Sequence, residues 1–467
     1  MNLKISGFIR NFSYSMLSNI ISLAISTIVI ALVPKVIDVT GYGYFQLYMF
    51  YASYIGFFHL GWCDGIYLRY GGEYYENLDK KKMSSQFWLL LFFEIVITLS
   101  LFLIIFMISP EKDKGLILFL TAFSILIVIP KTLLSYILQM TNRIKEYSII
   151  TIAEKFIYCI FVLIFIIQKN QNYYMYIYAD LIGKIASLIV AVVYCSKIVF
   201  SRIESIKIGV IEAFKNINVG SKLMIANIAG MLILGIIRIA IEDNWSIEVF
   251  GKVSLSISVS NMMMVFINAM GIVLFPMLKR MDDKVMNSLY DKLRDILMIV
   301  LFISLAFYYP LKELLSIWLP SYEESFKYMA LLFPVCIYEC KMTMLVSTYL
   351  KACRKEKIML VVNMITVALS LCCAWIFVYK MNNLDLTVFS LFCLFAFRCI
   401  VSEILLFLYM NKKSTLDIII EFILSLIFIG SFYFISNAFS LFVYLVFLFI
   451  YIFYKRNIIF QYLKINR

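Results

Sequence analysis

The sequence predicts an all-α integral membrane protein, from its hydropathy, the length of its apolar runs and the placement of its basic residues. Of its 467 residues, 63% are hydrophobic and only 15% are charged. The mean hydropathy is +0.91. A water-soluble chain of this length needs more polar surface than so few charged residues supply. We therefore expect the chain to be embedded in a lipid bilayer.

The apolar runs have the length of transmembrane helices. A helix needs roughly 20 apolar residues to cross the ~30 Å hydrocarbon core, whereas a strand of a membrane barrel needs about 10. The first run lacks the short core and cleavage site of a signal peptide, so we expect it to be retained. The expected spans, about fourteen in number, are residues 12–33, 45–67, 87–108, 116–139, 149–167, 174–196, 220–241, 250–276, 295–316, 326–350, 358–379, 386–409, 417–436 and 438–454.

Basic residues test this count independently, because loops rich in Lys and Arg stay in the cytoplasm. If Lys4 and Arg10 are inside and the spans alternate, most of the 42 basic residues fall in or beside inside segments. Both termini are therefore predicted to be cytoplasmic. The net charge of +13 follows from this topology, so we expect the basic loops to meet anionic membrane lipids and no nucleic acid.

Internal repetition divides the chain into halves. Asn19 and Asn227 are separated by the same number of residues as Gly43 and Gly251. Six helices in each half give both halves the same orientation, and transporters with such parallel repeats hold substrate between the halves. We expect two six-helix lobes around a central cavity, followed by two further helices. The expected domains are 1–197 (N-terminal lobe), 198–219 (cytoplasmic connector), 220–412 (C-terminal lobe) and 413–467 (two helices and a tail).

The loops argue against an enzyme. The longest expected inside connections, 197–219 and 277–294, are too short for a catalytic domain, and the sequence has no GxxxxGK[ST] phosphate-binding loop. One histidine and no paired CxxC units support neither a metal site nor another cofactor. We therefore expect a protein that binds and moves a substrate.

Several motifs carry a family resemblance. They are GYGYF (41–45), LGWCDGIYLRYGG (60–72), LQMTNRIKEY (138–147) and the string IIRIAIEDNWSIEVFGKVSLSISVSNMMMVFINAMGIVLFPMLKR (236–280). Together they resemble the polysaccharide-transport branch of the MATE-like (MOP) exporter superfamily, and within it the Wzx-type O-antigen and capsule repeat-unit flippases. The resemblance covers nearly the whole chain, and its motifs are patterns of Gly, Asn, Pro and basic residues.

The resemblance implies two lobes in a V around a central cavity. It also implies that the protein flips undecaprenyl-diphosphate-linked oligosaccharides across a bacterial inner membrane by ion-coupled alternating access. The implied partners are the lipid-linked oligosaccharide, membrane lipids and, as a further candidate, the polysaccharide polymerase and chain-length machinery. A lipid II flippase, a MATE-like drug or cation antiporter and, less strongly, a membrane polysaccharide polymerase stay open as alternatives. The arginines expected of lipid II flippases are missing, since Arg10 and Arg69 lie only at span edges.

Basic residues inside spans are the candidate substrate ligands. A charge at the bilayer centre costs ~3 kcal/mol or more unless it meets water or a partner. Ion pairs that hold helices together are the competing interpretation, and Asp180 is four residues before Lys184, so these two can meet on one helix face. The four bases proposed to bind diphosphate or acidic sugar oxygens are Lys184, Arg398, Arg238 and Lys341.

Acidic residues at depth, together with the single histidine, are the candidates for ion coupling. A carboxylate that binds a cation in one state and pairs with a base in the other supplies the energy difference that alternating access needs. The coupling ion is expected to be H⁺ or Na⁺. The candidates are Asp180, Glu339, Glu94, His59 and Asp64.

Small polar residues follow single faces of two spans. Such stripes also let membrane helices pack closely, so this structural interpretation stays open. The polar residues expected to line the cavity are Asn19, Ser22, Asn227 and Asn261.

Overall fold

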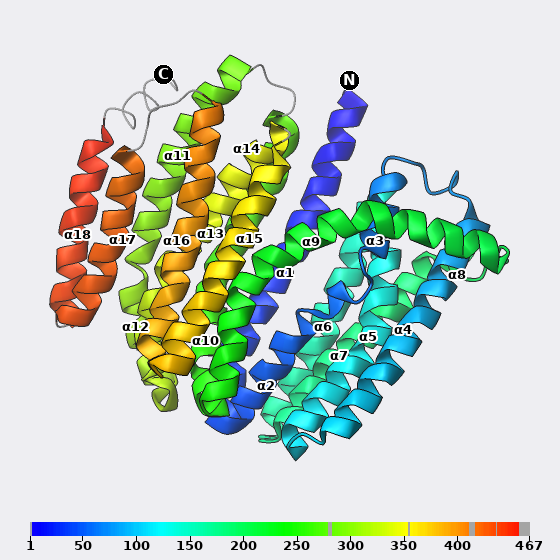
Figure 1. The fold of residues 1–467 in the computed structure, drawn as a ribbon, viewed down its shortest axis with the longest axis horizontal. Coiled ribbons are helices and arrows are strands. Elements are labelled where there is room, and N and C mark those ends of the chain that lie inside the picture. Colours follow the sequence, from blue (N-terminus) through cyan, green and yellow to red (C-terminus); the bar gives the residue numbers. More distant parts are fainter. Residues whose placement is uncertain (1, 279–282, 354, 411–415, 436, 457–467) are drawn as a thin grey trace. The chain divides into compact units, whose positions relative to one another are not determined.

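The computed structural model describes residues 2–278, 283–353, 355–410, 416–435 and 437–456, and within them the side chains outside 2–12, 263–288, 356, 437 and 438. The described residues form helices joined by short turns, with no strand among them (Figure 1). The predicted all-α fold class is confirmed.

The chain divides into two compact units, an N-terminal unit (Met1–Ile228) and a C-terminal unit (Ala229–Arg467). The boundary lies inside the 39-residue helix α9 (Ile206–Asn244). The expected connector 198–219 is therefore largely helical. The assignment of four functional domains stays a prediction.

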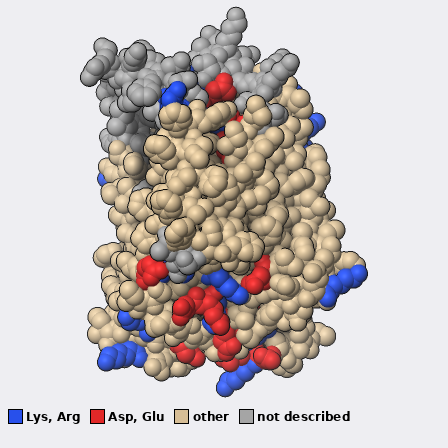
Figure 2. All heavy atoms as spheres, turned by 90° about the vertical axis from the view of Figure 1, so that its left-hand side faces the viewer, with Lys and Arg blue, Asp and Glu red and all other residues tan. Residues whose placement is uncertain are grey.

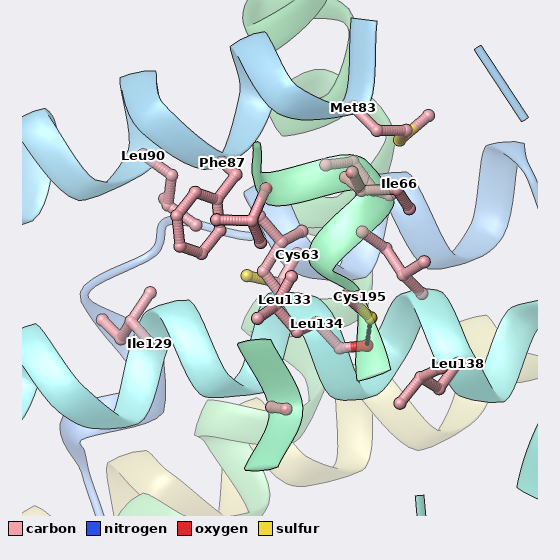
Figure 3. Close-up of a cluster of buried hydrophobic side chains, with 14 of the residues drawn as sticks. Cys63, Ile66, Met83, Phe87, Leu90, Ile129, Leu133, Leu134, Leu138 and Cys195 are labelled. Carbon is pink, nitrogen blue, oxygen red and sulfur yellow. Dashed lines mark hydrogen bonds between the residues drawn. The ribbon is translucent and has the colours of Figure 1, made fainter. Parts of the chain in front are cut away.

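Helices of the N-terminal unit run mainly side by side and surround a hydrophobic core (Figures 1 and 3). Cys63, Leu90 and Leu133 lie in this core, and the Cys195 thiol donates to the Leu134 carbonyl over 3.9 Å (Figure 3). The elements before α9 are α1 (Asn2–Val36), α2 (Val39–Ala52), η1 (Ile55–Phe57), α3 (Trp62–Arg69), α4 (Lys80–Ile108), α5 (Lys112–Met140), α6 (Ile144–Ile167), α7 (Tyr173–Tyr194) and α8 (Ser196–Val199).

The C-terminal unit is also a bundle of helices (Figure 1). Two of its elements, η3 and η4, are π-helical, a form that is rare and often found at functional positions. The elements are α10 (Ile247–Leu278), α11 (Asp283–Leu305), α12 (Tyr308–Trp318), η2 (Pro320–Tyr322), α13 (Ser325–Cys340), η3 (Lys341–Val346), α14 (Ser347–Ala352), α15 (Glu356–Cys373), η4 (Ala374–Lys380), α16 (Leu384–Tyr409), α17 (Leu416–Phe434) and α18 (Asn437–Tyr454).

Length and hydropathy identify a multi-pass membrane protein. Eleven helices of the described part of the chain are long and apolar enough to span a membrane, and the apolar helix Phe439–Tyr454 is shorter. The expected span 250–276 lies within α10, a 32-residue helix whose side chains are described only in part. One face of the protein shows a broad uncharged band between charged residues nearer its two ends (Figure 2).

The expected span 45–67 is not one helix, so this prediction was wrong. Its place is taken by α2 and α3, with a break in the α-helix over residues 53–61 that contains the short 3-10 helix η1. Leu60 and Gly61 have left-handed backbone conformations, with φ of 53° and 83°. The hydropathy of a window cannot register such a turn, because it depends on backbone conformation and on local hydrogen bonds.

The first half of α9 has an apolar face that the protein does not cover. Ile206, Ile211 and Phe214 are 72%, 48% and 69% exposed, whereas Glu212 and Asn216 are buried against the N-terminal unit. An exposed apolar face on a helix that also carries lysines is typical of a helix lying in a membrane interface. This amphipathic pattern explains why helix α9 begins well before the expected span 220–241.

Candidate functional site

Lys184 lies on α7 in a buried polar group that also includes a tyrosine. Its Nζ is 2.6 Å from Asp180 Oδ2, so the expected pair is confirmed. The Tyr48 hydroxyl on α2 donates to the same Asp180 oxygen over 2.8 Å, and Lys184 donates to that hydroxyl over 3.2 Å. The three residues join α2 to α7, and the charge of Lys184 is compensated in this conformation.

A second ion pair extends this group across the N-terminal unit. Lys131 on α5 is 2.7 Å from Glu154 on α6, and the Ser187 hydroxyl of α7 donates to Glu154 over 3.3 Å. Asp180 and Glu154 interact electrostatically with each other. These residues and the Lys184 pair therefore form one polar cluster at membrane depth.

Lys155 is the cluster's uncompensated charge. It lies at the middle of the 24-residue helix α6, is half-buried, and interacts electrostatically with both Asp180 and Glu154. Among the described residues it donates no hydrogen bond and forms no direct ion pair. The cluster then holds three bases and two acids, and so one excess positive charge. Its members are Lys131, Lys155, Lys184, Glu154 and Asp180.

Arg398 in the C-terminal unit is buried and paired with a carboxylate, as Lys184 is in the N-terminal unit. From α16 its Nη1 is 2.8 Å from Glu339 Oε2 on α13, and its Nε donates to Asn363 on α15 over 2.8 Å. A Cβ added at Gly230 of α9 would lie 3.3 Å from Arg398 Nη2. The glycine therefore leaves room for the guanidinium, which is buried and paired.

Lys341 lies in a buried network of ion pairs. It is 1% exposed and donates to Glu403 and, over 2.8 Å, to Glu421. Arg294 of α11 contacts the same two carboxylates at 2.7 and 2.9 Å and Asp417 at 3.3 Å. Lys341 is therefore compensated by two carboxylates in this conformation. Its role as a substrate ligand stays a prediction.

Arg238 makes contacts within the C-terminal unit. Its Nη2 donates to the Ser254 hydroxyl on α10 over 2.9 Å, and its guanidinium lies 5.1 Å from the centre of the Phe250 ring. A cation over an aromatic face is stabilised by the ring quadrupole. Arg238 is thus half-buried and oriented by α10.

The ion-coupling candidates differ in their surroundings. Glu94 is 0% exposed, and neither of its carboxylate oxygens has a hydrogen-bond partner among the described residues. His59 and Asp64 are also buried, and His59 Nε2 is 3.8 Å from Asp64 Oδ2. Asp180 and Glu339 pair with the bases described above. Among the described residues, Glu94 is thus the candidate without a partner, and the other four candidates each have a charged or titratable partner.

The four polar residues expected to line the cavity differ in how much of each is exposed. Asn19 and Ser22 on α1 are half-buried, and the Ser22 hydroxyl oxygen is buried with no partner among the described residues. Asn227 and Asn261 are exposed on their respective units. Their role in lining a cavity stays a prediction.

The sequence comparison gives the family. Residues 8–282 match the family model described as polysaccharide biosynthesis protein. The chain belongs to the polysaccharide biosynthesis protein family. No curated protein sequence matches the chain. Family membership confirms the resemblance predicted from the motifs.

Solved structures show the fold of this family member. The inward-facing form of a multidrug resistance MATE family transporter of the MOP superfamily has a TM-score of 0.62 at 12% identity, and the match covers 86% of this chain and 98% of that one. Lipid II flippase MurJ in an inward closed conformation has a TM-score of 0.61 at 13% identity, covering 96% and 99%. At such identities the matches establish a shared MOP-type fold.

Several residues of the site were not predicted. Lys155, Glu403 and Glu421 are charged residues inside apolar spans, which is the signal that could have found them. Tyr48 had no such signal, because its function in the cluster depends on the position of Asp180 on a helix far along the chain.

Proposed function

We propose that this protein flips oligosaccharide repeat units linked to undecaprenyl diphosphate across the bacterial inner membrane by ion-coupled alternating access. Both termini lie in the cytoplasm in this proposal. Membership of the polysaccharide biosynthesis family supports the sugar part of the cargo. The MurJ-type fold over 96% of the chain supports a lipid-linked cargo, since that neighbour is named a lipid II flippase.

The observation that carries the proposal is the excess positive charge of the polar cluster in the N-terminal unit. A buried charge is retained at membrane depth where it has a partner. Lys155 lies beside two compensated pairs and has no direct partner among the described residues. A diphosphate supplies the missing negative charge, and a lysine ammonium meets it as a point charge.

In the N-terminal unit, a paired base adds to this site when cargo binds, because phosphate oxygens compete with Asp180 for Lys184. In the C-terminal unit, phosphate oxygens compete in the same way with Glu339 for Arg398. An arginine suits two parallel hydrogen bonds to phosphate, and Arg238 is a further candidate for such bonds. A carboxylate that is released from its base becomes a site for the coupling cation.

The proposal is tested in a strain that lacks this gene and any redundant transporter. We expect lipid-linked repeat units to accumulate on the cytoplasmic face and surface polysaccharide to be lost. The wild-type gene should restore export, as should Lys112→Met, which removes an exposed lysine at the start of α5. Lys155→Met should fail although the protein accumulates in the membrane. Normal surface polysaccharide in the deletion strain would show that the proposal is wrong.

Lipid II is the second candidate cargo, and the extent of the MurJ match favours it over a drug or a cation. The match to MurJ covers 96% of the chain, whereas the match to the inward-facing MATE transporter covers 86%. Depletion of a host's own lipid II flippase distinguishes the two cargoes. Growth restored by this protein would assign lipid II, and continued lysis with restored surface polysaccharide would assign the repeat unit.

A further inference from the structure

The break between α2 and α3 is held by the chain's single histidine. The Gly61 amide donates to His59 Nδ1 over 3.0 Å. A side-chain acceptor that binds the amide two residues later is the arrangement of an Asx turn, here made by an imidazole. The bond spans Leu60, whose φ of 53° is unfavourable for a residue with a Cβ. The Trp62 amide also donates to the His59 carbonyl over 2.8 Å, so the Nδ1 lone pair is one of two acceptors on His59 that hold the turn.

This bond fixes the protonation state of His59. Nδ1 accepts, so it carries no proton, and in the neutral ring the proton lies on Nε2. Nε2 is the atom near Asp64, 3.8 Å from Oδ2. A second proton has to go to Nδ1, where it would face the Gly61 amide as one donor against another. The conformation described here thus holds neutral His59, and protonation breaks the side-chain hydrogen bond of the turn, which leaves the backbone bond from Trp62 to the His59 carbonyl.

After this turn, the backbone of α3 contacts the backbone of α9 directly. A Cβ at Gly65 would lie 1.9 Å from the Asn216 carbonyl oxygen, and one at Gly220 would lie 1.9 Å from the Gly61 carbonyl oxygen. No side chain fits between the two helices at these points. The contact is thus possible only while the left-handed turn places Gly61 against α9.

Side chains complete this contact, which we call the α3–α9 clasp (residues 61–70 and 212–221). Arg69 Nη2 is 2.7 Å from Glu212 Oε1, and the Tyr70 hydroxyl donates to the same oxygen over 2.7 Å. Arg69 also donates to the Asn216 side chain. Glu212 is thus the acid of α9 that meets α3, and it is compensated by Arg69.

Acidic and neutral titratable groups lie next to His59 and along the start of α3. Asp64 and Cys63 lie on α3, Tyr136 on α5 interacts electrostatically with Asp64, and Glu94 on α4 with Cys63. Nearby acids favour an imidazolium once the ring can accept a proton. Burial of His59 and the Gly61 bond both oppose that step. The closed clasp therefore favours the neutral ring, and an open clasp favours the imidazolium.

We propose that His59 is the binding site of the coupling proton, and that a proton on Nδ1 opens the α3–α9 clasp. The proposal rests on the proposed function, and it adds the identity of the ion and its site. A proton from solvent binds the Nδ1 lone pair, the Gly61 amide loses its acceptor, and Gly61 leaves α9. Helix α9 is continuous from Ile206 to Asn244, and its last residues belong to the C-terminal unit. A displacement of its first half therefore also displaces residues of the C-terminal unit.

Hydrogen exchange of the full-length protein in lipid nanodiscs tests the clasp directly. We compare segments 58–66 and 214–222 at about pH 7.5 and about pH 5.5, corrected for the intrinsic pH dependence of exchange. If opening of the clasp is linked to the binding of one proton, the equilibrium constant for opening rises up to tenfold for each pH unit, or up to about 100-fold over this interval. We expect a rise in both segments, and an unchanged rate in wild type would overturn the proposal.

The matched variant is His59→Asn. Asparagine keeps an acceptor for the Gly61 amide in an Asx turn but binds no proton in this pH range. We expect a closed clasp at both pH values in this variant. If His59→Asn does not accumulate, His59→Gln serves instead, since it also cannot titrate. A rise in either variant equal to that of wild type would overturn the proposal.

Transport separates this proposal from the proposed function. In the deletion strain we expect His59→Asn to accumulate in the membrane and to lose export. Full export by His59→Asn would exclude His59 as the coupling site while the flippase function stands. Normal surface polysaccharide in the deletion strain itself would refute the flippase function, and the exchange experiment would still report on the clasp.

Discussion

Arg294 and Glu403 form an ion pair of 2.7 Å between α11 and α16, with side chains that are only 2% and 0% exposed. Lys341 and Glu421 belong to the same network of ion pairs, in which Arg294 also contacts Asp417 at 3.3 Å. Glu421 lies on α17, one of the two helices expected to be additional to the six-helix lobe. The ion pairs thus tie α17 to α11 and η3, and make it part of the core of the C-terminal unit.

The first prediction follows from this burial. Glu403→Leu removes a carboxylate that Arg294 and Lys341 share, and leaves Lys341 with Glu421 alone. Breaking a buried pair costs about 3–5 kcal/mol. We expect a large fall in the unfolding temperature of the detergent-solubilised protein. The control is Asp385→Leu, because the Lys327–Asp385 pair is 41% and 49% exposed and such pairs are worth about 0–1 kcal/mol. Equal effects of the two variants would contradict the structural role of the cluster.

Local spacing explains which ion pairs could be predicted. Asp180 and Lys184 are four residues apart on one helix, so sequence alone indicates their contact. Lys341 and Glu403 are 62 positions apart, and Arg398 and Glu339 are 59 apart. Helix packing brings those residues together, and no periodicity in the sequence reports it. Charges within spans could therefore be identified as important, but their partners could not.

The helices could likewise be predicted from the sequence, whereas the break in the second expected span could not. Apolar length located the helices, because each must match the thickness of a membrane. The end of the break at residues 53–61 is held by the bonds from Gly61 and Trp62 to His59, with Leu60 in a left-handed conformation. Neither feature changes the hydropathy of the segment. Gly61 is the one residue of this turn whose type favours a left-handed conformation, and a glycine is equally compatible with close helix packing.

The second prediction concerns the glycines of the α3–α9 clasp. A methyl group at Gly65 would lie 1.9 Å from the Asn216 carbonyl oxygen, so the helices must separate. We expect Gly65→Ala to raise hydrogen exchange in segments 58–66 and 214–222 at neutral pH and to impair export. Gly56→Ala is the control, because a Cβ there meets nothing within 4 Å. Unchanged exchange in Gly65→Ala would show that the clasp is not a close contact in the membrane.

The third prediction concerns Glu94, whose two oxygens have no partner among the described residues. Burying a polar group without a hydrogen bond costs about 1–3 kcal/mol by mutational data. We expect Glu94→Leu to raise the stability of the protein by about that amount, measured as an increase in the unfolding temperature. A decrease would mean that Glu94 has a partner in the membrane, such as water or a bound cation.

The fourth prediction separates the substrate role of Arg398 from its structural role. Arg398→Gln removes the charge that compensates Glu339, so one carboxylate is left without its base. Loss of export by this variant alone could thus come from lower stability, by about 1–3 kcal/mol. Adding Glu339→Gln replaces the ion pair by two neutral amides, and should restore most of that stability.

If Arg398 binds the diphosphate, the double variant Arg398→Gln/Glu339→Gln should be as stable as wild type and still fail to export. We would compare unfolding temperature and surface polysaccharide for wild type, both single variants and the double variant. Export restored together with stability would make the pair purely structural. Export lost in the stable double variant but retained in Glu339→Gln would assign the loss to the guanidinium, because the two proteins differ only at residue 398.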